Sequence, residues 1–548
     1  MRGLMMDAPL SIPALLRRAE SLFAHKSVIN RRTDHSVGRS TYGECLADGR
    51  RLAAAMRALG VRQGDRVATF CWSHAEHLQA YYGIPGSGAV LHTLNIRLHA
   101  DELAYIINHA DDAVIIVDKV LWPAFEPVRS RVGDRRIVVV SDDDNVPEGT
   151  LHYGQLLSWQ EDGAAFDDID EHAAAVMCYT SGTTGRSKGV LYSHRSLVLH
   201  SLASALPDAM DLGEDARVLA VVPMFHANAW GLPFSCAMVG ATQVLPGPYL
   251  DPASIVELLV SERATHTFGV PTICHALLRH LDEHPEHDLS TLRMMLVGGA
   301  AIPEATVRAF DARHGVQIVH AWGMTETSPL GSVSRVPSEL AEASDAERYA
   351  WRARQGRPAP FVEVRGRAED GTLIPWDDRA MGELEVRGPW VAGAYYPGDE
   401  APDRWTNDGW LRTGDIVTIS PSGCLMIQDR AKDLVKSGGE WISTVALETA
   451  LLDHPGVSEA VVVAVPHPHW GERPLAVVVP MPGCAPCIEE LRAHLAPRVA
   501  KWWLPDAVVH VESLPRTGTG KYQKNVVRAA YQQHFSTPAV STKLGAQA

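Results

Sequence analysis

The chain has 548 residues, of which 46% are hydrophobic and 21% charged, a balance that excludes a largely disordered chain, a collagen and a coiled coil. Fifty Lys and Arg against 65 Asp and Glu give a net charge of −15, which argues against nucleic-acid partners and against docking on anionic lipid. At roughly one domain per 150 residues, the length allows three or four folded units.

The first predicted elements alternate between helical and strand patterns. They are, in chain order, helix 40–60, strand 65–72, helix 74–90, strand 112–118 and strand 135–142. We expect Gly60 to close the first helix, and Gly83 and Pro85 to end the second. Such alternation predicts βαβ units around a parallel sheet.

The same rhythm resumes between residues 171 and 320. The candidate strands there are AVMCYT, RVLAVVP, ATQVLPG, THTFGVP, RMMLVGG and VQIVHAW. Between about 355 and 430, the glycine-punctuated runs FVEVRGR, GELEVRG and CLMIQD indicate a smaller antiparallel barrel or sheet. Strands and helices then alternate to the end of the chain.

We therefore expect an α/β protein with two unequal parts. A large N-terminal domain, residues 1–430, would hold two parallel-type αβ subdomains and a small β-barrel-like subdomain at about 355–430. A small, mobile α+β domain would follow as a lid at residues 431–548.

The chain offers few signals for export or for a membrane. Its N-terminal apolar stretch is short and broken by prolines, so it is not a secretory signal. No apolar run approaches the roughly 18 residues of a spanning helix, so we expect no integral membrane segment. Eight cysteines are sparse, which fits reduced thiols in the cytoplasm, and we interpret Cys484 and Cys487 as part of a surface loop because no second pair completes a metal site.

A loop rich in glycine and hydroxyl groups follows one predicted strand, at Thr180-Ser-Gly-Thr-Thr-Gly-Arg-Ser-Lys-Gly189. Backbone amides and hydroxyls in this density suit a phosphate cradle. A flexible surface loop has the same composition, so composition leaves both interpretations open. The loop is not a Walker A motif, because Ser187 and Gly189 stand where that motif needs glycine and Ser/Thr. A helix is expected from Ser193.

At this loop the chain resembles a known family. YTSGTTGRSKGV is similar to the signature of the acyl-adenylate-forming (ANL) superfamily of acyl-CoA synthetases, luciferases and peptide-synthetase adenylation domains. Further matches follow in the family's order: WGMTET (322–327), GELEVRG (382–388), WLRTGD (410–415), DRAKDLVKSGGEWIS (429–443) and LPRTGTGK (514–521). PMFHANAWGLP (223–233) and VLPGPYLDPAS (244–254) look most like bacterial medium- and long-chain fatty acyl-CoA synthetases.

The resemblance implies an AMP-forming acid–thiol ligase. A fatty acid, medium-chain by the nearest branch, would attack the α-phosphorus of Mg·ATP to give acyl-AMP and pyrophosphate, and the CoA thiol would then displace AMP. Positioning and charge stabilisation would carry the rate. The implied metal is Mg²⁺, the co-substrates are ATP and CoA, and a homodimer is expected. The alternatives are a ligase for a short acid such as 3-methylthiopropionate, acyl transfer to a carrier protein, or a non-catalytic nucleotide-binding module.

The resemblance also implies a role for individual residues in holding the nucleotide. The residues that would hold its phosphates are Thr180, Ser181, Gly182, Thr183, Thr184, Gly185 and Lys188. Thr184 and Glu326 match the magnesium ligands, which suits a hard ion that bridges phosphates. Gly299, Ala300, Gly323 and Thr325 would border the nucleotide.

Asp415 matches the acceptor of the ribose hydroxyls, and Arg430 would contact ribose or phosphate. Trp322 stands where many relatives carry the tyrosine that stacks on adenine, and an indole can still stack. Taken without the motifs, Glu326 is interpreted as a solvated acid, Asp415 as a turn residue, Arg430 as an exposed ion pair and Trp322 as core.

The C-terminal part would supply mobile groups. Lys521 matches the lysine that reaches the substrate carboxylate and the α-phosphate, although a lysine at random is a surface residue. Lys432 matches the hinge between the two domains, since the two half-reactions need different faces of the small domain. Lys436 would approach the nucleotide, and Trp441 in SGGEW would border the pantetheine path; the segment also fits a tight turn.

The acyl pocket is assigned to a second set of residues. His226 and Trp230 are four positions apart and would share one face of a local helix, with Trp230 a gate to the acyl tunnel. A satisfied core histidine is the alternative for His226, to which we assign no acid–base role. Small residues at Gly298 and Gly299 would leave room for an apolar chain. The HPH run at 467–469 is interpreted as a loop rather than a metal site.

Overall fold

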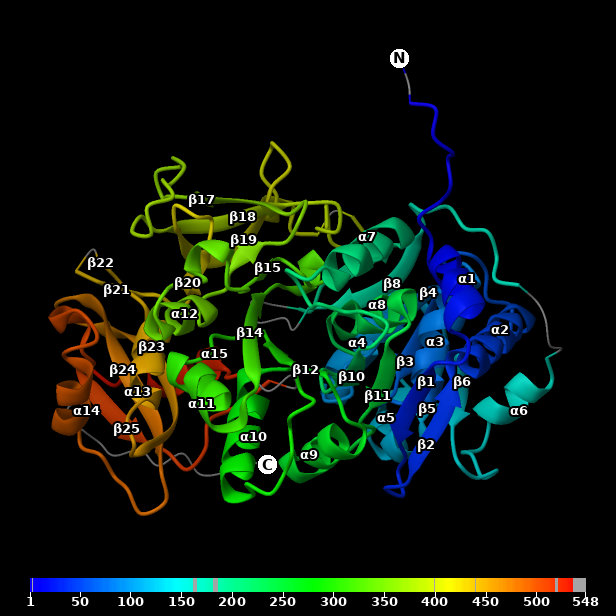
Figure 1. Ribbon diagram of the computed structural model, residues 1–548, viewed down its shortest axis with the longest axis horizontal. Coiled ribbons are helices and arrows are strands. Elements are labelled where there is room, and N and C mark those ends of the chain that lie inside the picture. The colour runs from blue at the N-terminus through cyan, green and yellow to red at the C-terminus, as the bar shows by residue number, and fades with distance from the viewer. Residues whose placement is uncertain are drawn as a thin grey trace.

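The computed structural model of the chain describes residues 1, 3–160, 165–180, 186–398, 400–438, 440–517 and 521–535. Two large sheets lie side by side, a small antiparallel sheet lies above them, and the C-terminal part lies at one end (Figure 1). The predicted α/β class, with a large N-terminal part and a small C-terminal part, is confirmed. Among the described residues, no helix combines the length and the apolar character that crossing a bilayer requires.

The first sheet has seven strands in the order β7-β6-β5-β3-β4-β8-β9. Its strands are β3 (Arg66–Phe70), β4 (Val90–Thr93), β5 (Asp112–Asp118), β6 (Arg136–Val140), β7 (Leu151–His152), β8 (Ala174–Tyr179) and β9 (Gly189–Ser193). All neighbours pair in parallel except β8 and β9. Its helices are α2 (Tyr42–Ala58), α3 (Ala75–Gly86), α4 (Ala100–Ala110), α5 (Trp122–Arg129) and α6 (Tyr153–Ser158).

These elements confirm the predicted βαβ units but correct two details. The helix expected to end at Gly83 and Pro85 continues through both to Gly86. Gly83 is needed for packing instead, because a Cβ there would lie 2.4 Å from the Gly49 carbonyl oxygen of α2. The strand β9 between the phosphate loop and the next helix was not predicted, so the loop joins two antiparallel strands.

The second sheet has nine strands in the order β16-β15-β14-β13-β12-β10-β11-β1-β2. Its strands are β1 (Ser27–Arg31), β2 (Val37–Thr41), β10 (Arg217–Ala220), β11 (Thr242–Leu245), β12 (His266–Gly269), β13 (Met294–Val297), β14 (Gln317–Trp322), β15 (Ser332–Val333) and β16 (Arg357–Pro358). The central strands β11, β12 and β13 are buried along their whole length, as expected where both faces of a parallel sheet are covered.

Helices cover this sheet on both faces. They are α1 (Ile12–Phe23), α7 (His194–Ala205), α8 (Leu232–Val239), α9 (Pro252–Ser261), α10 (Pro271–Glu283), α11 (Glu304–His314) and α12 (Asp345–Arg352). The helix expected from Ser193 is confirmed as α7, with the Ser193 hydroxyl accepting the Ser196 amide as its N-cap. Helix α1 contacts α2 and α3 as well as α7 and α8, and so joins the two sheets.

The third sheet is antiparallel, in the order β17-β18-β19-β20. Its strands are β17 (Glu363–Arg367), β18 (Gly382–Arg387), β19 (Leu411–Ile419) and β20 (Leu425–Arg430). The expectation of a barrel is corrected to an open sheet, because β17 and β20 are its two edges in the described part of the chain.

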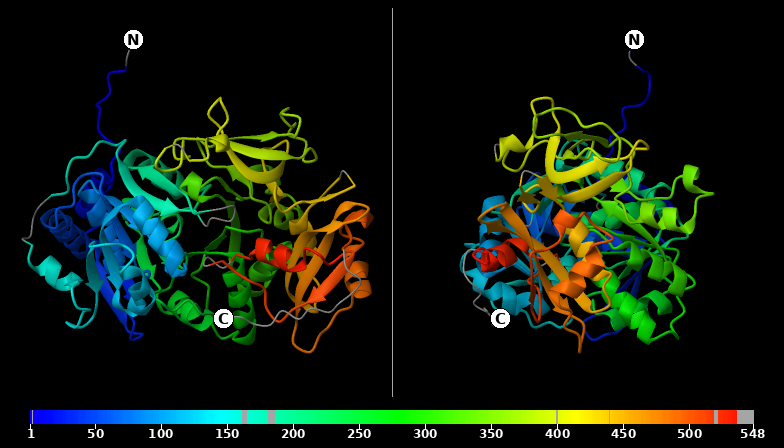
Figure 2. Two further views of the ribbon diagram at one scale, coloured as in Figure 1. Left: turned by 180° about the vertical axis from the view of Figure 1, so that it is seen from behind. Right: turned by 90° about the vertical axis from the view of Figure 1, so that its left-hand side faces the viewer.

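The C-terminal part folds as an α+β unit around a mixed sheet, as expected. Its elements are β21 (Val435–Ser437), β22 (Glu440–Ile442), α13 (Thr444–Leu452), β23 (Val457–His467), β24 (Gly471–Pro480), α14 (Ile488–Leu495), β25 (Ala507–His510) and α15 (Lys524–Tyr531). The long hairpin of β23 and β24 supplies its core. From behind, α15 is seen beside the sheet of the C-terminal part, where it packs against β23 (Figure 2).

Candidate active site

One cavity of about 440 Å³ opens where the second sheet, the antiparallel sheet and the C-terminal part meet. It lies at the carboxyl ends of β12, β13 and β14, the edge where open α/β sheets bind ligands. The predicted site residues that line it are Thr180, Lys188, His226, Trp230, Gly298, Gly299, Trp322, Gly323, Thr325, Glu326, Arg430, Lys432 and Lys521.

Other predicted residues lie elsewhere. Ala300 does not line the cavity, and its carbonyl oxygen lies 3.1 Å from His320 Nε2. Lys436 Nζ pairs with Glu369 at 2.9 Å and lies 5.7 Å from the centre of the Trp441 ring, and neither Lys436 nor Trp441 lines the cavity. Ser181, Gly182, Thr183, Thr184 and Gly185 fall outside the described residues.

Asp415 is buried and does not itself line the cavity, but both of its carboxylate oxygens contact residues that do. The indole N–H of Trp322 donates to Asp415 Oδ2 at 2.9 Å, and Arg430 Nε lies 2.7 Å from Oδ1. The register of the sheet explains the pairing, because Asp415 of β19 lies opposite Arg430 of β20. Three residues from three separate motifs therefore form one contact group.

Glu326 is buried, and a residue that the sequence reasoning missed holds it. The hydroxyl of Tyr395 donates to Glu326 Oε1, and Lys188 Nζ lies 5.6 Å from the centre of the Tyr395 ring. Burial and the Glu326 charge raise the pKa of Tyr395, so the phenol stays protonated and remains a donor. A buried carboxylate beside phosphate-loop residues is a hard oxygen ligand, which fits Mg²⁺.

The ends of the phosphate loop are closed by backbone pairing. The Thr180 amide donates to the Lys188 carbonyl at 2.9 Å, and the Lys188 amide donates to Thr180 Oγ1 at 3.2 Å. This continues the β8–β9 ladder and holds Lys188 at the cavity wall.

Lys521 reaches the cavity from the C-terminal part and lies over Gly299. A Cβ built on Gly299 would be 3.2 Å from Lys521 Cε and 3.6 Å from Nζ. Burial and the Arg430 charge lower the pKa of Lys521 to about 8, and the charges of Asp415 and Glu326 act against that shift. Because burial disfavours the positive charge of Lys521, its ammonium is well suited to pair with an anionic ligand.

Helix α15 anchors the segment that carries Lys521. Lys524 Nζ lies 2.8 Å from Glu448 Oε1 and donates to Thr444 Oγ1 at 2.6 Å. Arg528 pairs with Asp433 at 3.1 Å, one residue beyond the expected hinge at Lys432. The segment that follows Lys521 is thus tied to the start of the C-terminal part.

The apolar side of the cavity contains His226 and Trp230, but the segment that carries them is not a right-handed helix. Residues Ala227, Asn228, Ala229 and Trp230 have φ of 43°, 57°, 49° and 55°, so the local turn is left-handed and the expectation of one right-handed helical face is wrong. Both side chains line the cavity all the same. Burial and the Lys521 charge lower the pKa of His226 to about 3, so its ring is neutral.

The structure also brings in residues to which the sequence assigned no role. They are Arg97, Arg186, Val270, Ile273, Glu383, Tyr395 and Arg404. Arg186 and Glu383 lie inside recognised motifs, whereas the other five lie outside them and are gathered only by the fold. The run Tyr395-Tyr396-Pro397 beside GELEVRG was the one available hint.

Two lesser predictions have definite outcomes. Cys484 and Cys487 are exposed free cysteines, and Cys487 caps the N-terminus of α14 as a loop residue. His467 Nδ1 accepts the amides of His469 and Trp470 at 3.2 and 3.3 Å, so the HPH run is a hydrogen-bonded turn.

Comparison with known proteins places this geometry among enzymes. The AMP-binding enzyme family matches residues 17–396, and the AMP-binding enzyme C-terminal domain matches residues 446–521. The chain is 49% identical over 533 residues to a long-chain-fatty-acid–CoA ligase of Thermus thermophilus, covering 97% of both chains.

Two further relatives span the same range. A medium-chain-fatty-acid–CoA ligase of Ectopseudomonas oleovorans is 41% identical, covering 97% of this chain and 98% of its own. A 3-methylmercaptopropionyl-CoA ligase of Ruegeria lacuscaerulensis is 40% identical, covering 97% and 99%. Among solved structures, the anthranilate CoA ligase AuaEII in complex with anthranoyl-AMP superimposes with a TM-score of 0.86 at 25% identity, over 97% of this chain and 99% of that one.

Proposed function

This chain belongs to the family of AMP-binding enzymes, and we propose that it is an ATP-dependent acyl-CoA ligase that activates a medium- or long-chain fatty acid through acyl-AMP. The observation that carries the proposal is one cavity lined by Lys521, Glu326, Arg430 and apolar residues, with Asp415 paired to Arg430. Two relatives named as fatty-acid–CoA ligases support the substrate class.

The nucleotide half of the cavity is assigned as follows. Thr180 and Lys188 hold the phosphates, and Asp415 with Arg430 receives the ribose. Trp322 borders the adenine, and its indole N–H keeps the Asp415 carboxylate oriented. Glu326 and Thr184, the latter outside the described residues, would hold Mg²⁺. When bound, the ion would neutralise negative charge between the phosphates.

The acid half lies on the other side of Lys521. His226, Trp230, Gly298 and Gly299 enclose the acyl chain, because they line the apolar end of the cavity. The Lys521 ammonium lies between the two halves and would orient the acid carboxylate against the α-phosphorus. Its positive charge stabilises the charge that develops there, and no covalent bond to the protein is required.

CoA is proposed to enter after the C-terminal part rotates about Lys432. Lys436 and Trp441 do not line the cavity, whereas Lys521 does. A rotation that withdraws Lys521 and brings this hairpin in would serve the second half-reaction. We place the domain boundary between residues 430 and 431, in the interval between the two family matches.

Assembly and compartment are part of the proposal. The resemblance supports a homodimer, which light scattering on the purified protein tests directly. Six of the eight cysteines are buried free thiols, which supports a reducing cytoplasm.

A ligation screen tests the activity. Purified enzyme is given ATP, Mg²⁺ and CoA with saturated acids from propionate to palmitate, and with thioether and aryl acids, while AMP and acyl-CoA are measured. We expect the highest kcat/KM with a medium- or long-chain fatty acid. A maximum at 3-methylthiopropionate would instead favour a ligase for that short acid, a function that the Ruegeria relative supports. Turnover only with a carrier protein would overturn CoA as the acceptor, and an absence of acid-dependent pyrophosphate exchange would overturn the enzyme.

A further inference from the structure

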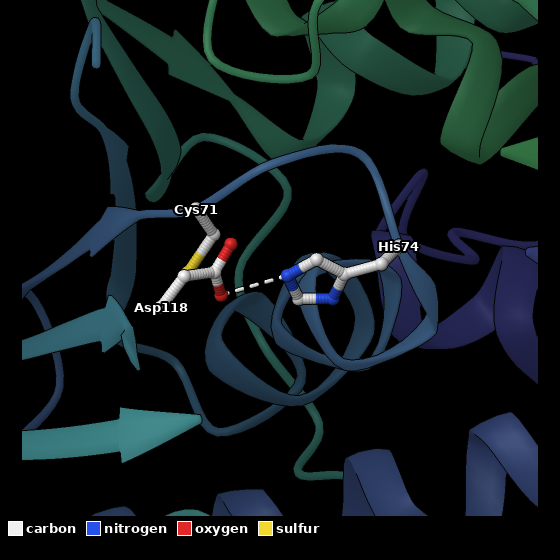
Figure 3. A group of neighbouring side chains, drawn as sticks. All are labelled: Cys71, His74 and Asp118. Carbon is white, nitrogen blue, oxygen red and sulfur yellow. Dashed lines mark hydrogen bonds and ion pairs between the residues drawn. The ribbon is translucent and has the colours of Figure 1, made fainter. Parts of the chain in front are cut away.

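A cluster of three potential metal ligands lies in the first sheet, away from the cavity described above. Cys71 follows β3, His74 caps the N-terminus of α3, and Asp118 ends β5 (Figure 3). Neither the proposed ligase chemistry nor any motif of the sequence uses them. We propose that Cys71, His74 and Asp118 form a zinc-binding site.

The position of the cluster in the sheet favours a ligand. Strand β3 lies between β4 and β5, and the chain leaves β3 toward β4 but leaves β5 toward β6 on the opposite side. Adjacent strands whose connections run in opposite directions create a crevice at their carboxyl ends, where α/β sheets bind ligands. The cluster lies at that point. Segments that follow β10 and β11 cover this end of the sheet, since Ser73 pairs with Gly247 and its hydroxyl accepts the Met224 amide at 3.3 Å.

The ligand atoms have the spacing that one small ion requires. A sulfur, a ring nitrogen and a carboxylate oxygen of the three residues lie within 4.8 Å of one another. Zinc bonds are about 2.0–2.3 Å long, so an ion among the three atoms reaches each of them after small rotations. A set of one sulfur, one nitrogen and one oxygen suits Zn²⁺, whereas Mg²⁺ and Ca²⁺ take oxygen ligands. Water would complete the tetrahedron from the side of His74, the one member that is not fully buried.

The surroundings already orient the ligands. The Trp72 amide donates to Asp118 Oδ2 at 2.7 Å, while Oδ1 faces His74 Nε2 at 2.8 Å. Glu76 Oε2 lies 2.9 Å from the other ring nitrogen, Nδ1. A carboxylate behind a ligating histidine fixes the ring and its tautomer, which is the usual support of a zinc-bound imidazole.

The charge balance of the cluster also permits Zn²⁺ to replace protons. His74 lies between the carboxylates of Asp118 and Glu76; with a proton on each ring nitrogen it sets one positive charge against two negative charges and a neutral thiol. On binding, Zn²⁺ replaces the Nε2 proton of His74 and the Cys71 thiol proton, and both protons are released to solvent. The net charge of the cluster is the same before and after, because the two charges of the ion replace two protons.

The competing explanation is an ion pair without metal. His92 and Asp112 form such a pair in the same sheet at 2.9 Å, with both side chains fully buried and no third ligand reported within the described residues. The feature that separates the two cases is Cys71. Its thiol lies 3.7 Å from the Ile116 carbonyl and also contacts the side chains of His74 and Asp118, so this pair, unlike His92 and Asp112, has a sulfur ligand beside it.

The test is metal binding by the chelator-treated full-length protein. Zn²⁺ is titrated and counted by mass spectrometry after dialysis, and Co²⁺ is used as a spectroscopic probe of thiolate ligation. We expect one Zn²⁺ per chain and a thiolate-to-Co²⁺ band, both lost in Cys71→Ser and in His74→Asn. Glu76→Gln should weaken binding by about 10–100-fold. The matched control is His152→Asn, since His152 also caps a helix but lies beside no such cluster, and it should bind like wild type.

Three results would overturn the site. One is wild-type protein that retains no zinc. Another is zinc that persists in Cys71→Ser but disappears in His284→Asn, which would assign the ion to the surface histidines His280, His284 and His287, whose rings lie 4.5–6.1 Å apart. The last needs no variant and stays informative if a variant fails to fold: X-ray absorption of zinc-loaded wild type that shows no sulfur ligand.

Discussion

The indole N–H of Trp322 donates to Asp415 Oδ2 at 2.9 Å, so a residue assigned to the adenine also fixes the carboxylate assigned to the ribose. Arg430 holds the other oxygen at 2.7 Å. The carboxylate is therefore oriented from both sides, and Trp322 contributes a donor as well as an aromatic face.

Trp322→Phe separates these two contributions, because phenylalanine keeps a ring and removes the donor. A hydrogen bond to a charged group contributes about 1.5–3 kcal/mol, so we expect KM for ATP to rise about tenfold or more. The fatty-acid KM should change little. Initial rates against ATP concentration measure the effect, and exposed Trp159→Phe is the matched control. An unchanged KM for ATP would mean that the indole N–H has no part in nucleotide binding.

Two adjacent glycines should respond differently to the same substitution. A Cβ on Gly299, whose φ is +86°, would lie 3.2 Å from Lys521 Cε, so Gly299→Ala should slow adenylation of every acid. A Cβ on Gly298 would lie 3.2 Å from Trp230 Cη2, so Gly298→Ala should shift preference toward shorter acids. Pyrophosphate exchange across an acid series measures both. Identical profiles for the two variants would contradict the division of the cavity.

The pH profile of adenylation should report Lys521. Its pKa is lowered to about 8 by burial and by Arg430, and a lysine is charged below its pKa. If the ammonium is required, kcat/KM for pyrophosphate exchange falls as the pH rises through about 8, since this ratio follows the free enzyme. Lys521→Arg should remove that limb, because arginine keeps its charge throughout this range. A decline that persists in Lys521→Arg would assign the titration to another group.

Lys432→Pro tests the hinge, because proline restricts φ at the position where rotation is proposed. Pyrophosphate exchange should persist, since Lys521 already lies in the cavity. Thioester release should fall by at least tenfold, and the ratio of the two rates is the measured quantity. Lys432→Ala is the control, as it removes the side chain but leaves the backbone free. Full thioester formation in the proline variant would exclude rotation at this residue.

The sequence predicted elements that depend on local pattern. Strands such as β5 and β13 are continuous β-branched or apolar runs, and their burial on both faces follows from the pattern. Strands β1 and β2 were missed, because β1 pairs with β11 more than two hundred positions away and no local signal records that partner. The left-handed turn at Trp230 was missed for a related reason: only tertiary packing stabilises positive φ in four successive residues with a Cβ.

The site residues divide in the same way, into those with a local sequence signal and those without one. Those inside family motifs, such as Glu326 and Lys521, were identified before the structure, and the structure brings them to one cavity. Tyr395 and the ligands around His74 lay outside any recognised motif. Their significance depends on partners that are distant in sequence, and it becomes visible only once the strands are placed side by side.

The most direct measurement of the central claim compares the two half-reactions of Lys521→Ala. Acid-dependent pyrophosphate exchange reports acyl-AMP formation, and acyl-CoA formed from supplied acyl-AMP reports thioester formation. The account predicts that the variant loses the exchange and retains thioester formation near the wild-type rate. Equal loss of both half-reactions, or exchange at the wild-type rate, would contradict it.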